Sequence, residues 1–340
     1  MNIDILAYPI DPRGPSGYRR LVKRFLLLLF VPVLWGCATT GPSPAERLQT
    51  EYPPERPFPE SRFSSFGGIR LHYRTWTPPD DTAGKVLLLH DVGGATVSFQ
   101  ELAPQLAERG FAVLAVDLPG FGFSDQALEF EHSPENRSNL LWSLADRLDT
   151  EENAFPPADR WILAGHGMGG RVVTQMTLDR PNRSERMILI ASRVLGSYNP
   201  GSFLWFPPVR WALHSWLANS IYTMEGVEEL LSEAYGRPAT PDEVDRYAAP
   251  LLRPNMASAY VRYASTAGTF EPDLSSIEVP TLVIWGTEDA WVNAELAEPT
   301  AEAFPNGRLT RIPEAGHLPM ETHTAAVRDA LTLWLEAAER

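Results

Sequence analysis

The segment Arg160–Gly170, RWILAGHGMGG, joins a short apolar run to a glycine-rich turn, and it decides the fold. The run WILA is typical of a buried strand, and the turn after it is expected to open a helix. Sequences of the form G-x-S-x-G use such a tight strand-to-helix turn to expose a serine hydroxyl. Here glycine stands at all three defined positions, so Gly167 occupies the place of the serine.

Short apolar runs alternate with amphipathic segments through most of the chain after residue 62. Continuous apolar runs are typical of parallel strands that are buried on both faces. This alternation predicts an α/β fold with a doubly wound, mostly parallel sheet and helices on both of its faces. The expected strands cover residues 85–89, 112–116, 161–164, 187–191, 281–285 and 308–312, after a hairpin within 63–77.

The strand pattern stops between about residues 194 and 270, where aromatic-rich helical segments replace it. We interpret this stretch as a helical cap inserted over the carboxyl ends of the strands, within a domain that covers residues 63–340. Four aromatic residues of the cap are Trp205, Phe206, Trp211 and Trp216. We expect these rings to line the interior of the cap, because large aromatics dominate buried area. An exposed surface that contacts a membrane or a protein partner is the alternative.

The N-terminus is expected to be an export signal. Five basic residues precede an apolar run, residues 25–35, which is too short to span a bilayer as a helix. The run ends at Leu34-Trp35-Gly36-Cys37, which resembles the lipobox of bacterial lipoproteins, where cleavage leaves a diacylated cysteine. Residues 1–36 are then the lipoprotein signal peptide, and residues 37–62 a proline-rich, semi-extended tether. The resemblance implies attachment through Cys37 to a membrane of the bacterial cell envelope, and Ala38 favours the periplasmic face of the outer membrane.

The net charge, the cysteine count and the spacing of the histidines limit which partners and cofactors the chain is expected to bind. The formal charge of −14 argues against nucleic acid as a partner. Cys37 is the single cysteine, so the fold has no disulfide. The histidines show no metal-ligand spacing, and we expect neither a metal nor a cofactor.

Four further segments occur in a fixed order along the chain. They are HDVGG at 90–94, DLPGFGFSD at 117–125, WGTED at 285–289 and GH at 316–317. With the glycine turn at 165–169, these segments resemble the α/β-hydrolase family from about residue 63 to the end. The resemblance implies an eight-stranded sheet, a helical cap, and a small apolar substrate or ligand under the cap.

The resemblance also assigns roles to individual residues. His317 matches the family's catalytic base, and Asp289 matches the acid that orients it. Val92 and Met168 match the positions whose N–H groups bind the oxyanion of the substrate. Two positions depart from the pattern: Gly167 leaves the nucleophile position vacant, and Asp91 replaces a glycine of the oxyanion segment. A carboxylate at position 91 would place negative charge where the family stabilises it.

These departures allow two interpretations. The chain is a binding protein or pseudoenzyme without acyl-enzyme chemistry, because Gly167 has no hydroxyl. Alternatively it is an active hydrolase of small apolar esters, lactones or epoxides. In this second case a water enters the space that the serine side chain leaves, and His317 activates it. A role of Asp91 as nucleophile or acid is a further alternative.

Overall fold

The structure is a computed structural model. It describes residues 43–79, 82–150, 155, 160–196, 204 and 206–337. The expected signal peptide, Cys37 and Trp205 therefore lie outside the described residues.

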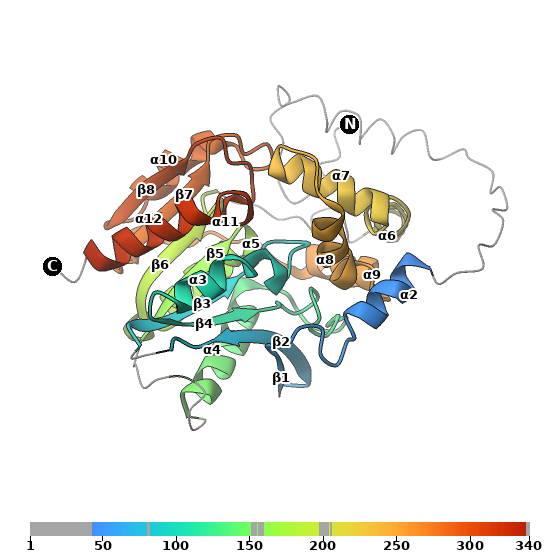
Figure 1. The fold of residues 1–340 in the computed structure, drawn as a ribbon, viewed down its shortest axis with the longest axis horizontal. Coiled ribbons are helices and arrows are strands. Elements are labelled where there is room, and N and C mark those ends of the chain that lie inside the picture. Colours follow the sequence, from blue (N-terminus) through green and yellow to red (C-terminus); the bar gives the residue numbers. More distant parts are fainter. Residues whose placement is uncertain are drawn as a thin grey trace.

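The centre of the molecule is an eight-stranded sheet (Figure 1) with strand order β1-β2-β4-β3-β5-β6-β7-β8. Strands β1 and β2 form the hairpin expected around Gly67-Gly68, and β2 pairs antiparallel with β4. All other neighbouring strands are parallel, which confirms the predicted fold class. The strands are β1 Ser61–Phe66, β2 Ile69–Trp76, β3 Gly84–Leu89, β4 Phe111–Val116, β5 Trp161–His166, β6 Ser184–Ile190, β7 Thr281–Gly286 and β8 Gly307–Ile312.

Helices cover both faces of this sheet and bury a hydrophobic core on each. One face packs against α3 and α12, and the other against α4, α5 and α10. Strands β3, β5 and β7 have six residues each, and all of these residues are buried, as expected for parallel strands between two helical layers. These helices are α3 Leu102–Ala107, α4 Pro134–Thr150, α5 Met168–Asp179, α10 Ala297–Glu302 and α12 Thr324–Ala337, with the short α11 Pro319–Thr322 before the last.

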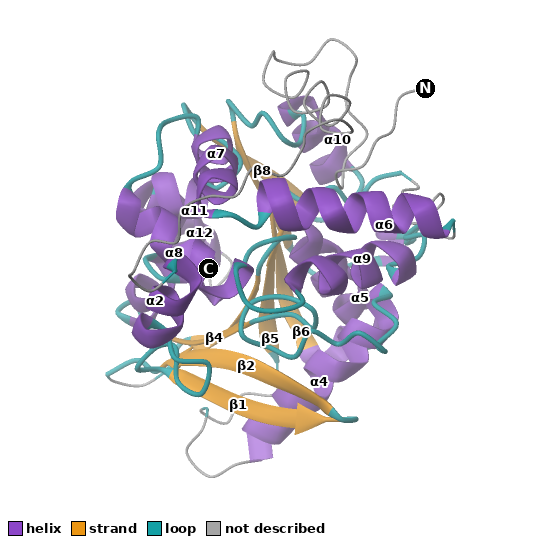
Figure 2. Cartoon of the chain, turned by 90° about the vertical axis from the view of Figure 1, so that its right-hand side faces the viewer, coloured by secondary structure: helices purple, strands orange, loops and turns teal. Residues whose placement is uncertain are grey.

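The expected cap is present between β6 and β7. Its helices lie together on one side of the molecule (Figure 1), and this side faces the viewer in Figure 2. Their bounds are α6 Pro207–Trp216, a π-helical turn Leu217–Ile221, α7 Met224–Tyr235, α8 Pro241–Leu251 and α9 Met256–Thr266.

The cap aromatics do not all point inward as expected. Phe206 is 48% exposed and Trp211 is 69% exposed, whereas Trp216 is partly buried against the core. The prediction of an inward-facing cluster is therefore wrong for the beginning of α6.

The expected extended tether is wrong for helix α2, Pro44–Glu51. Ser43 and Glu46 form a capping box, and a proline at the first helical position favours the start of the helix. Leu48 is buried, and Arg47 donates two hydrogen bonds of 2.8 Å to Asp245 of α8. This segment is folded onto the cap instead of extending from it.

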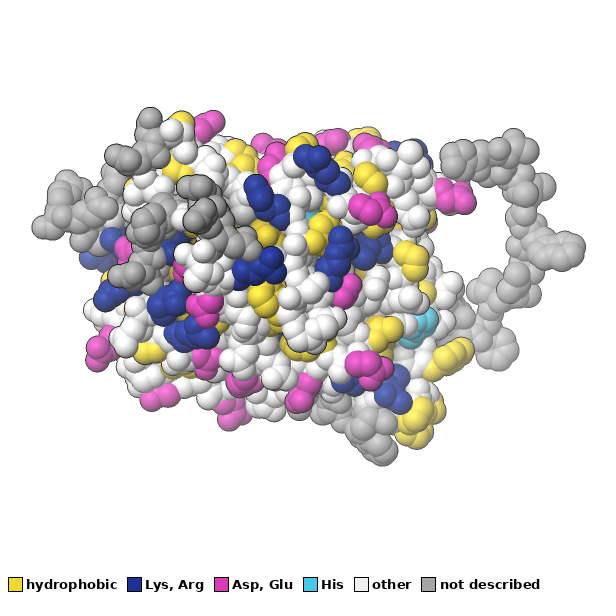
Figure 3. Space-filling model, turned by 90° about the horizontal axis from the view of Figure 1, so that it is seen from below, with side chains coloured by type: hydrophobic (Ala, Val, Ile, Leu, Met, Phe, Trp, Pro, Cys, Tyr) yellow, Lys and Arg dark blue, Asp and Glu magenta, His cyan; other side chains and the backbone are white. Residues whose placement is uncertain are grey.

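Two further observations concern the surface. No helix in the described part of the chain is long and apolar enough to cross a membrane. On the face shown in Figure 3, acidic and basic side chains are interspersed.

Candidate active site

The glycine turn between β5 and α5 has the backbone conformation of a strained strand-to-helix turn. Gly167 adopts φ +51° and ψ −114°, and its N–H donates to the carbonyl oxygen of Ile190 at 3.0 Å. A positive φ costs a residue with a Cβ free energy but costs glycine little. The turn therefore keeps the geometry that presents a side chain at position 167, although none is present.

The space above Gly167 is filled by Asp91, which follows β3. A Cβ added to Gly167 would lie 2.0 Å from Cγ of Asp91 and 2.2 and 2.3 Å from its two carboxylate oxygens. Contacts shorter than 3.0 Å essentially never occur for real Cβ atoms. The Asp91 carboxylate and a serine side chain at position 167 therefore exclude one another.

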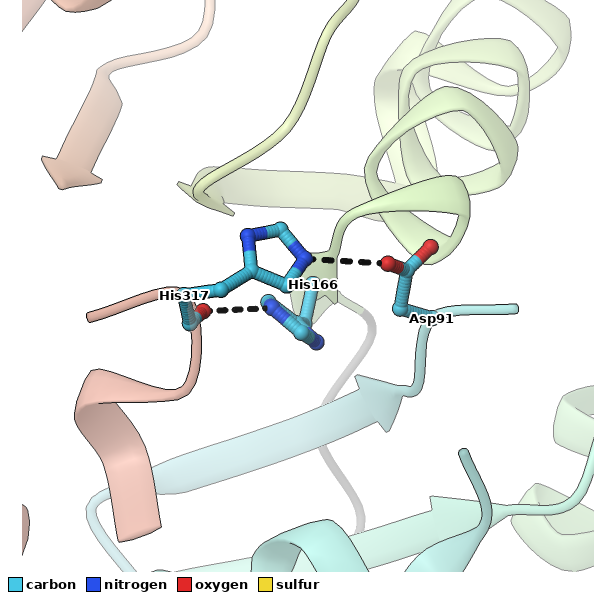
Figure 4. Close-up of side chains that lie close together, drawn as sticks. All are labelled: Asp91, His166 and His317. Carbon is cyan, nitrogen blue, oxygen red and sulfur yellow. Dashed lines mark hydrogen bonds and ion pairs between the residues drawn. The ribbon is translucent and has the colours of Figure 1, made fainter. Parts of the chain in front are cut away.

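The Asp91 carboxylate makes hydrogen bonds to two groups of the site. Its Oδ1 accepts from the backbone N–H of Met168 at 2.5 Å, the first amide of α5. Its Oδ2 lies 3.1 Å from Nε2 of His317 (Figure 4). In this view the carboxylate points from the loop after β3 toward the His317 ring. The carboxylate thus contacts both the His317 ring and the first backbone N–H of α5.

Asp289 holds the far side of the His317 ring. The Nδ1 of His317 lies 2.9 Å from Oδ2 of Asp289. The other oxygen of Asp289 accepts from the N–H groups of Trp291 and Val292, both at 2.9 Å. The Trp291 ring lies over His317 with the centroids 5.2 Å apart. These contacts fix the orientation of the imidazole.

The two carboxylates determine the charge of His317. Burial alone would lower its pKa, but the charges of Asp289 and Asp91 and their hydrogen bonds outweigh burial and raise the pKa to about 10. For Asp91, burial would raise the pKa, but the hydrogen bond from His317 and the nearby histidines lower it below its usual value. At neutral pH the site therefore holds an Asp91 carboxylate paired with a His317 imidazolium.

His90 anchors the loop that carries Asp91. Leu118 N–H donates to Nε2 of His90 at 2.9 Å, so the proton of this ring lies on Nδ1. That Nδ1 donates to the carbonyl oxygen of Asp91 at 2.7 Å. Val92 follows in the same loop and packs against the core. The position of Asp91 is thus fixed by its own backbone as well as by its side chain.

His166 lies directly below this pair, as Figure 4 shows, and its Nε2 donates to the carbonyl oxygen of His317 at 2.9 Å. Burial, together with the charge of His317, lowers the pKa of His166 to about 4, so this ring is neutral. Among the described residues, Asp91, His166 and His317 form a group with one possible metal-ligand atom each within 4.8 Å of one another. A metal bound there would have to displace the proton shared by Asp91 and His317, and we assign no metal to the group.

The structure brings together the residues that the sequence pointed to. Gly167, Met168, Asp289 and His317 lie at the carboxyl ends of β5, β7 and β8, where ligands bind in open α/β sheets. One expectation is wrong: the space that the serine leaves is not open to a water, because the Asp91 carboxylate fills it. The side chain of Asp91 points to the nucleophile position and not only to the oxyanion side.

The model of the alpha/beta hydrolase family matches residues 86–330, which covers most of β3, strands β4 to β8, the cap and every residue of this site. The chain belongs to the alpha/beta hydrolase family. Its Asp289 and His317 stand in loops that follow the family's seventh and eighth strands, in the family's order.

Relatives of this alpha/beta hydrolase cover most of its length. It is 23% identical over 266 residues to the uncharacterized hydrolase YugF of Bacillus subtilis, an alignment that spans 74% of this chain and 89% of that protein. It is 26% identical over 257 residues to a 2-hydroxy-6-oxononadienedioate/2-hydroxy-6-oxononatrienedioate hydrolase of Cupriavidus pinatubonensis, with 72% of this chain and 84% of that protein covered.

Solved structures of other hydrolases share the fold. The enol-lactonase of Burkholderia xenovorans has a TM-score of 0.64 at 20% identity, with 81% of this chain and 100% of that chain covered. A membrane phospholipase A described as a bacterial virulence factor has a TM-score of 0.66 at 19% identity, with 95% and 99% covered.

The sequence did not point to Arg137 of α4, whose guanidinium is buried beside Met168. No local motif marks this residue, because its neighbours come from the loop after β4, from α5 and from α9.

Proposed function

We propose that this chain is an active hydrolase in which the Asp91 carboxylate replaces the missing serine as the nucleophile. The observation that carries the proposal is the place of Asp91, within hydrogen-bond distance of both His317 and the N–H of Met168. A scaffold that had only lost its serine would need no carboxylate in the vacated space. Burying a charge is costly unless it is paired, and here His317 and the Met168 N–H pair with the Asp91 carboxylate.

A carboxylate nucleophile selects the kind of substrate. Attack on an ester carbonyl would give an anhydride, from which the expelled alkoxide readily re-forms the ester. Attack on a strained, saturated carbon gives an alkyl ester of Asp91, which is stable enough to be hydrolysed in a second step. We therefore infer that the substrates are epoxides, and that ordinary esters react slowly at this site.

The first step opens the epoxide. One oxygen of Asp91 forms a bond to the ring carbon, the carbon–oxygen bond of the ring breaks, and its electron pair remains on the alkoxide. The alkoxide takes the proton from Nε2 of His317, which is an imidazolium at neutral pH because of Asp289 and Asp91. The products of this step are a neutral ester on Asp91 and a neutral imidazole.

The second step hydrolyses this ester. Esterified Asp91 no longer carries the charge that helps to raise the pKa of His317, so the imidazole is now a general base. It removes a proton from water, and the hydroxide attacks Cγ of Asp91. The Met168 N–H stabilises the oxyanion of the tetrahedral intermediate. When this intermediate collapses, the bond from Cγ to the diol oxygen breaks, and that oxygen takes the proton of the newly added hydroxyl. The diol is released, the carboxylate is restored, and His317 keeps the proton from water as the imidazolium.

The proposal is tested by comparing substrates on the purified full chain in detergent. Diol formation from styrene oxide is followed beside hydrolysis of p-nitrophenyl acetate. We expect turnover of the epoxide and at most slow release of p-nitrophenol. Ester turnover without epoxide turnover would overturn the carboxylate mechanism.

A binding protein without turnover is the second candidate. It is favoured by the closed ion pair between Asp91 and His317, which leaves no free general base in the resting site. The same feature argues against direct activation of water by His317. Tight binding of an epoxide without formation of a diol would support this second candidate.

For the N-terminus we propose that the mature chain begins at Cys37, is lipidated there, and resides at the periplasmic face of the outer membrane. The lone cysteine directly after a basic and apolar segment supports this proposal. Metabolic labelling with a palmitate analogue is expected to mark the wild type but not Cys37→Ala. Equal labelling of both would contradict it.

A further inference from the structure

Arg137 places a buried positive charge next to the proposed nucleophile. The residue is 1% exposed and lies in the first turn of α4. One Nη donates to the carbonyl oxygen of Pro119 at 3.2 Å and to Nδ1 of His132 at 2.9 Å. The other Nη contacts Sδ of Met168 at 3.0 Å. None of these contacts neutralises the charge.

The cluster has a donor without an acceptor. Because Nδ1 of His132 accepts from Arg137, the proton of that ring lies on Nε2. This nitrogen interacts with the backbone of Ala127, but the Nε of Arg137 is buried and has no hydrogen-bond partner among the described residues. The sulfur of Met168 is only a weak acceptor. Buried polar groups are normally satisfied, so an unpaired donor on a cation indicates a missing anionic acceptor.

The charge of this cluster is positive and concentrated on one side chain. Burial lowers the pKa of Arg137 to about 10, which still leaves it protonated at neutral pH. Burial and the neighbouring charge of Arg137 lower the pKa of His132 to about 2, so that ring is neutral. No carboxylate in the described part of the chain pairs with Arg137, and a buried charge without a counter-charge is unfavourable.

Met168 connects the cluster to the reacting groups. Its backbone N–H binds Asp91, and its side chain covers Arg137. The ring of Tyr263 in α9 lies over the guanidinium at 4.9 Å, so the cluster is enclosed between α4, α5 and the cap (Figure 2). Tyr263 is also within electrostatic range of Asp91. The cation therefore lies under the cap, on the Met168 side of the nucleophile.

We propose that Arg137 and His132 form a subsite for a carboxylate carried by the substrate. The carboxylate takes the place of the Met168 thioether on one Nη of Arg137, while Pro119 and His132 hold the other Nη and so fix the guanidinium. An unbranched methionine side chain can move to another rotamer at small cost. The proposal rests on the proposed function and narrows it: the substrates are epoxides that also carry an anionic group.

The alternative is a purely structural arginine. The faces of Tyr263 and Phe121, 4.9 and 5.5 Å from the guanidinium carbon, stabilise a cation without any ligand. In that case the affinity for a ligand would not depend on its charge, and a substitution at residue 137 would not change the affinity of a charged ligand relative to a neutral one. Ligands of equal shape and different charge separate the two cases.

The experiment measures binding by calorimetry on the full chain. The probes are 3-phenylpropanoate and 3-phenylpropan-1-ol, which share a carbon skeleton and contain no epoxide. We expect the wild type to bind the carboxylate about tenfold more tightly than the alcohol, or better. Arg137→Met should bring the ratio of the two Kd values to about one, and Arg137→Lys should keep part of it.

Arg186→Met is the matched control. Arg186 is also buried, and it donates to the carbonyl oxygens of Trp334 and Leu335 at the end of α12, away from the site. This variant should keep the wild-type ratio. The proposal is overturned if the wild type binds both probes equally, if the preference survives Arg137→Met, or if Arg186→Met removes it as well.

The binding measurement is independent of turnover. A carboxylate preference that depends on Arg137, in a protein that converts no epoxide, would retain the subsite and reject the proposed chemistry. Epoxide turnover without such a preference would retain the chemistry and reject the subsite.

Discussion

The two halves of the site depart from the family pattern to different degrees. The loops after β7 and β8 keep Asp289 and His317, whereas the elements after β3 and β5 carry Asp91 for glycine and Gly167 for serine. The altered half nevertheless presents an oxygen to the same imidazole and the same backbone N–H. The two substitutions therefore compensate one another: the group that contacts His317 now comes from a different strand. The presence of Asp289 and His317 is explained if Asp91 still supplies a reacting carboxylate to the site.

We expect the largest effect from a substitution that removes the reacting carboxylate of Asp91. Asp91→Asn keeps the size of the side chain but removes its charge and most of its nucleophilicity. We expect epoxide turnover to fall by at least about 10³-fold. His317→Ala should abolish release of the diol, because it removes the base for the second step. Rates of diol formation check both variants.

Weakening the retained half should have a smaller effect. Asp289→Asn leaves His317 with one carboxylate instead of two, and we expect a loss of about 10²- to 10⁴-fold in kcat. The pKa of His317 is raised, so the imidazolium that donates the proton is lost as pH rises toward about 10 in the wild type. In Asp289→Asn this alkaline loss should move to lower pH. An unchanged pH–rate profile would contradict the role of Asp289.

Exchanging the two altered residues tests whether they compensate. Gly167→Ser alone should lower the free energy of unfolding by about 1 to 3 kcal/mol, because its Cβ collides with Asp91 and the backbone φ is positive. The double variant Asp91→Gly, Gly167→Ser should recover the part of the stability that the collision removes, and it should gain hydrolysis of p-nitrophenyl acetate. Thermal unfolding and ester assays on both singles and the double check this. Additive effects on stability would show that the two positions are independent.

The smallest expected effect is on the pH dependence of stability, through the contact of α11 with the cap helices α7 and α8. Glu321 of α11 is buried and accepts from Tyr235 of α7 at 2.7 Å and from Tyr247 of α8. Burial raises its pKa to about 7, so the folded protein holds this proton more tightly than the unfolded chain. The contribution to stability is full below about pH 4.5 and is lost as pH rises to about 7. Glu321→Gln should flatten this decrease, on the order of 1 to 3 kcal/mol, in chemical denaturation across this range.

Local patterns predicted the sheet and the retained half of the site for a physical reason. Strand runs and loop motifs are short-range signals, and β7 and β8 place Asp289 and His317 wherever the sheet forms. The direction of the Asp91 side chain is different, because it depends on space that a residue 76 positions later leaves open. Arg137 could not be predicted either, since its neighbours are brought together by tertiary packing. Helix α2 was predictable: Ser43 and Glu46 have the spacing of a capping box, although prolines on both sides obscured it.

The most direct test of the account is a single turnover of an epoxide by excess enzyme in H₂¹⁸O. If Asp91 forms an ester, water attacks Cγ, so the label enters the Asp91 carboxylate and the first diol carries unlabelled oxygen. Mass spectrometry of the peptide that contains Asp91, together with that of the diol, locates the label. Labelled Asp91 with unlabelled diol is the predicted result. Labelled diol with unlabelled Asp91 would show that water attacks the substrate directly, and it would contradict the role of Asp91 as nucleophile.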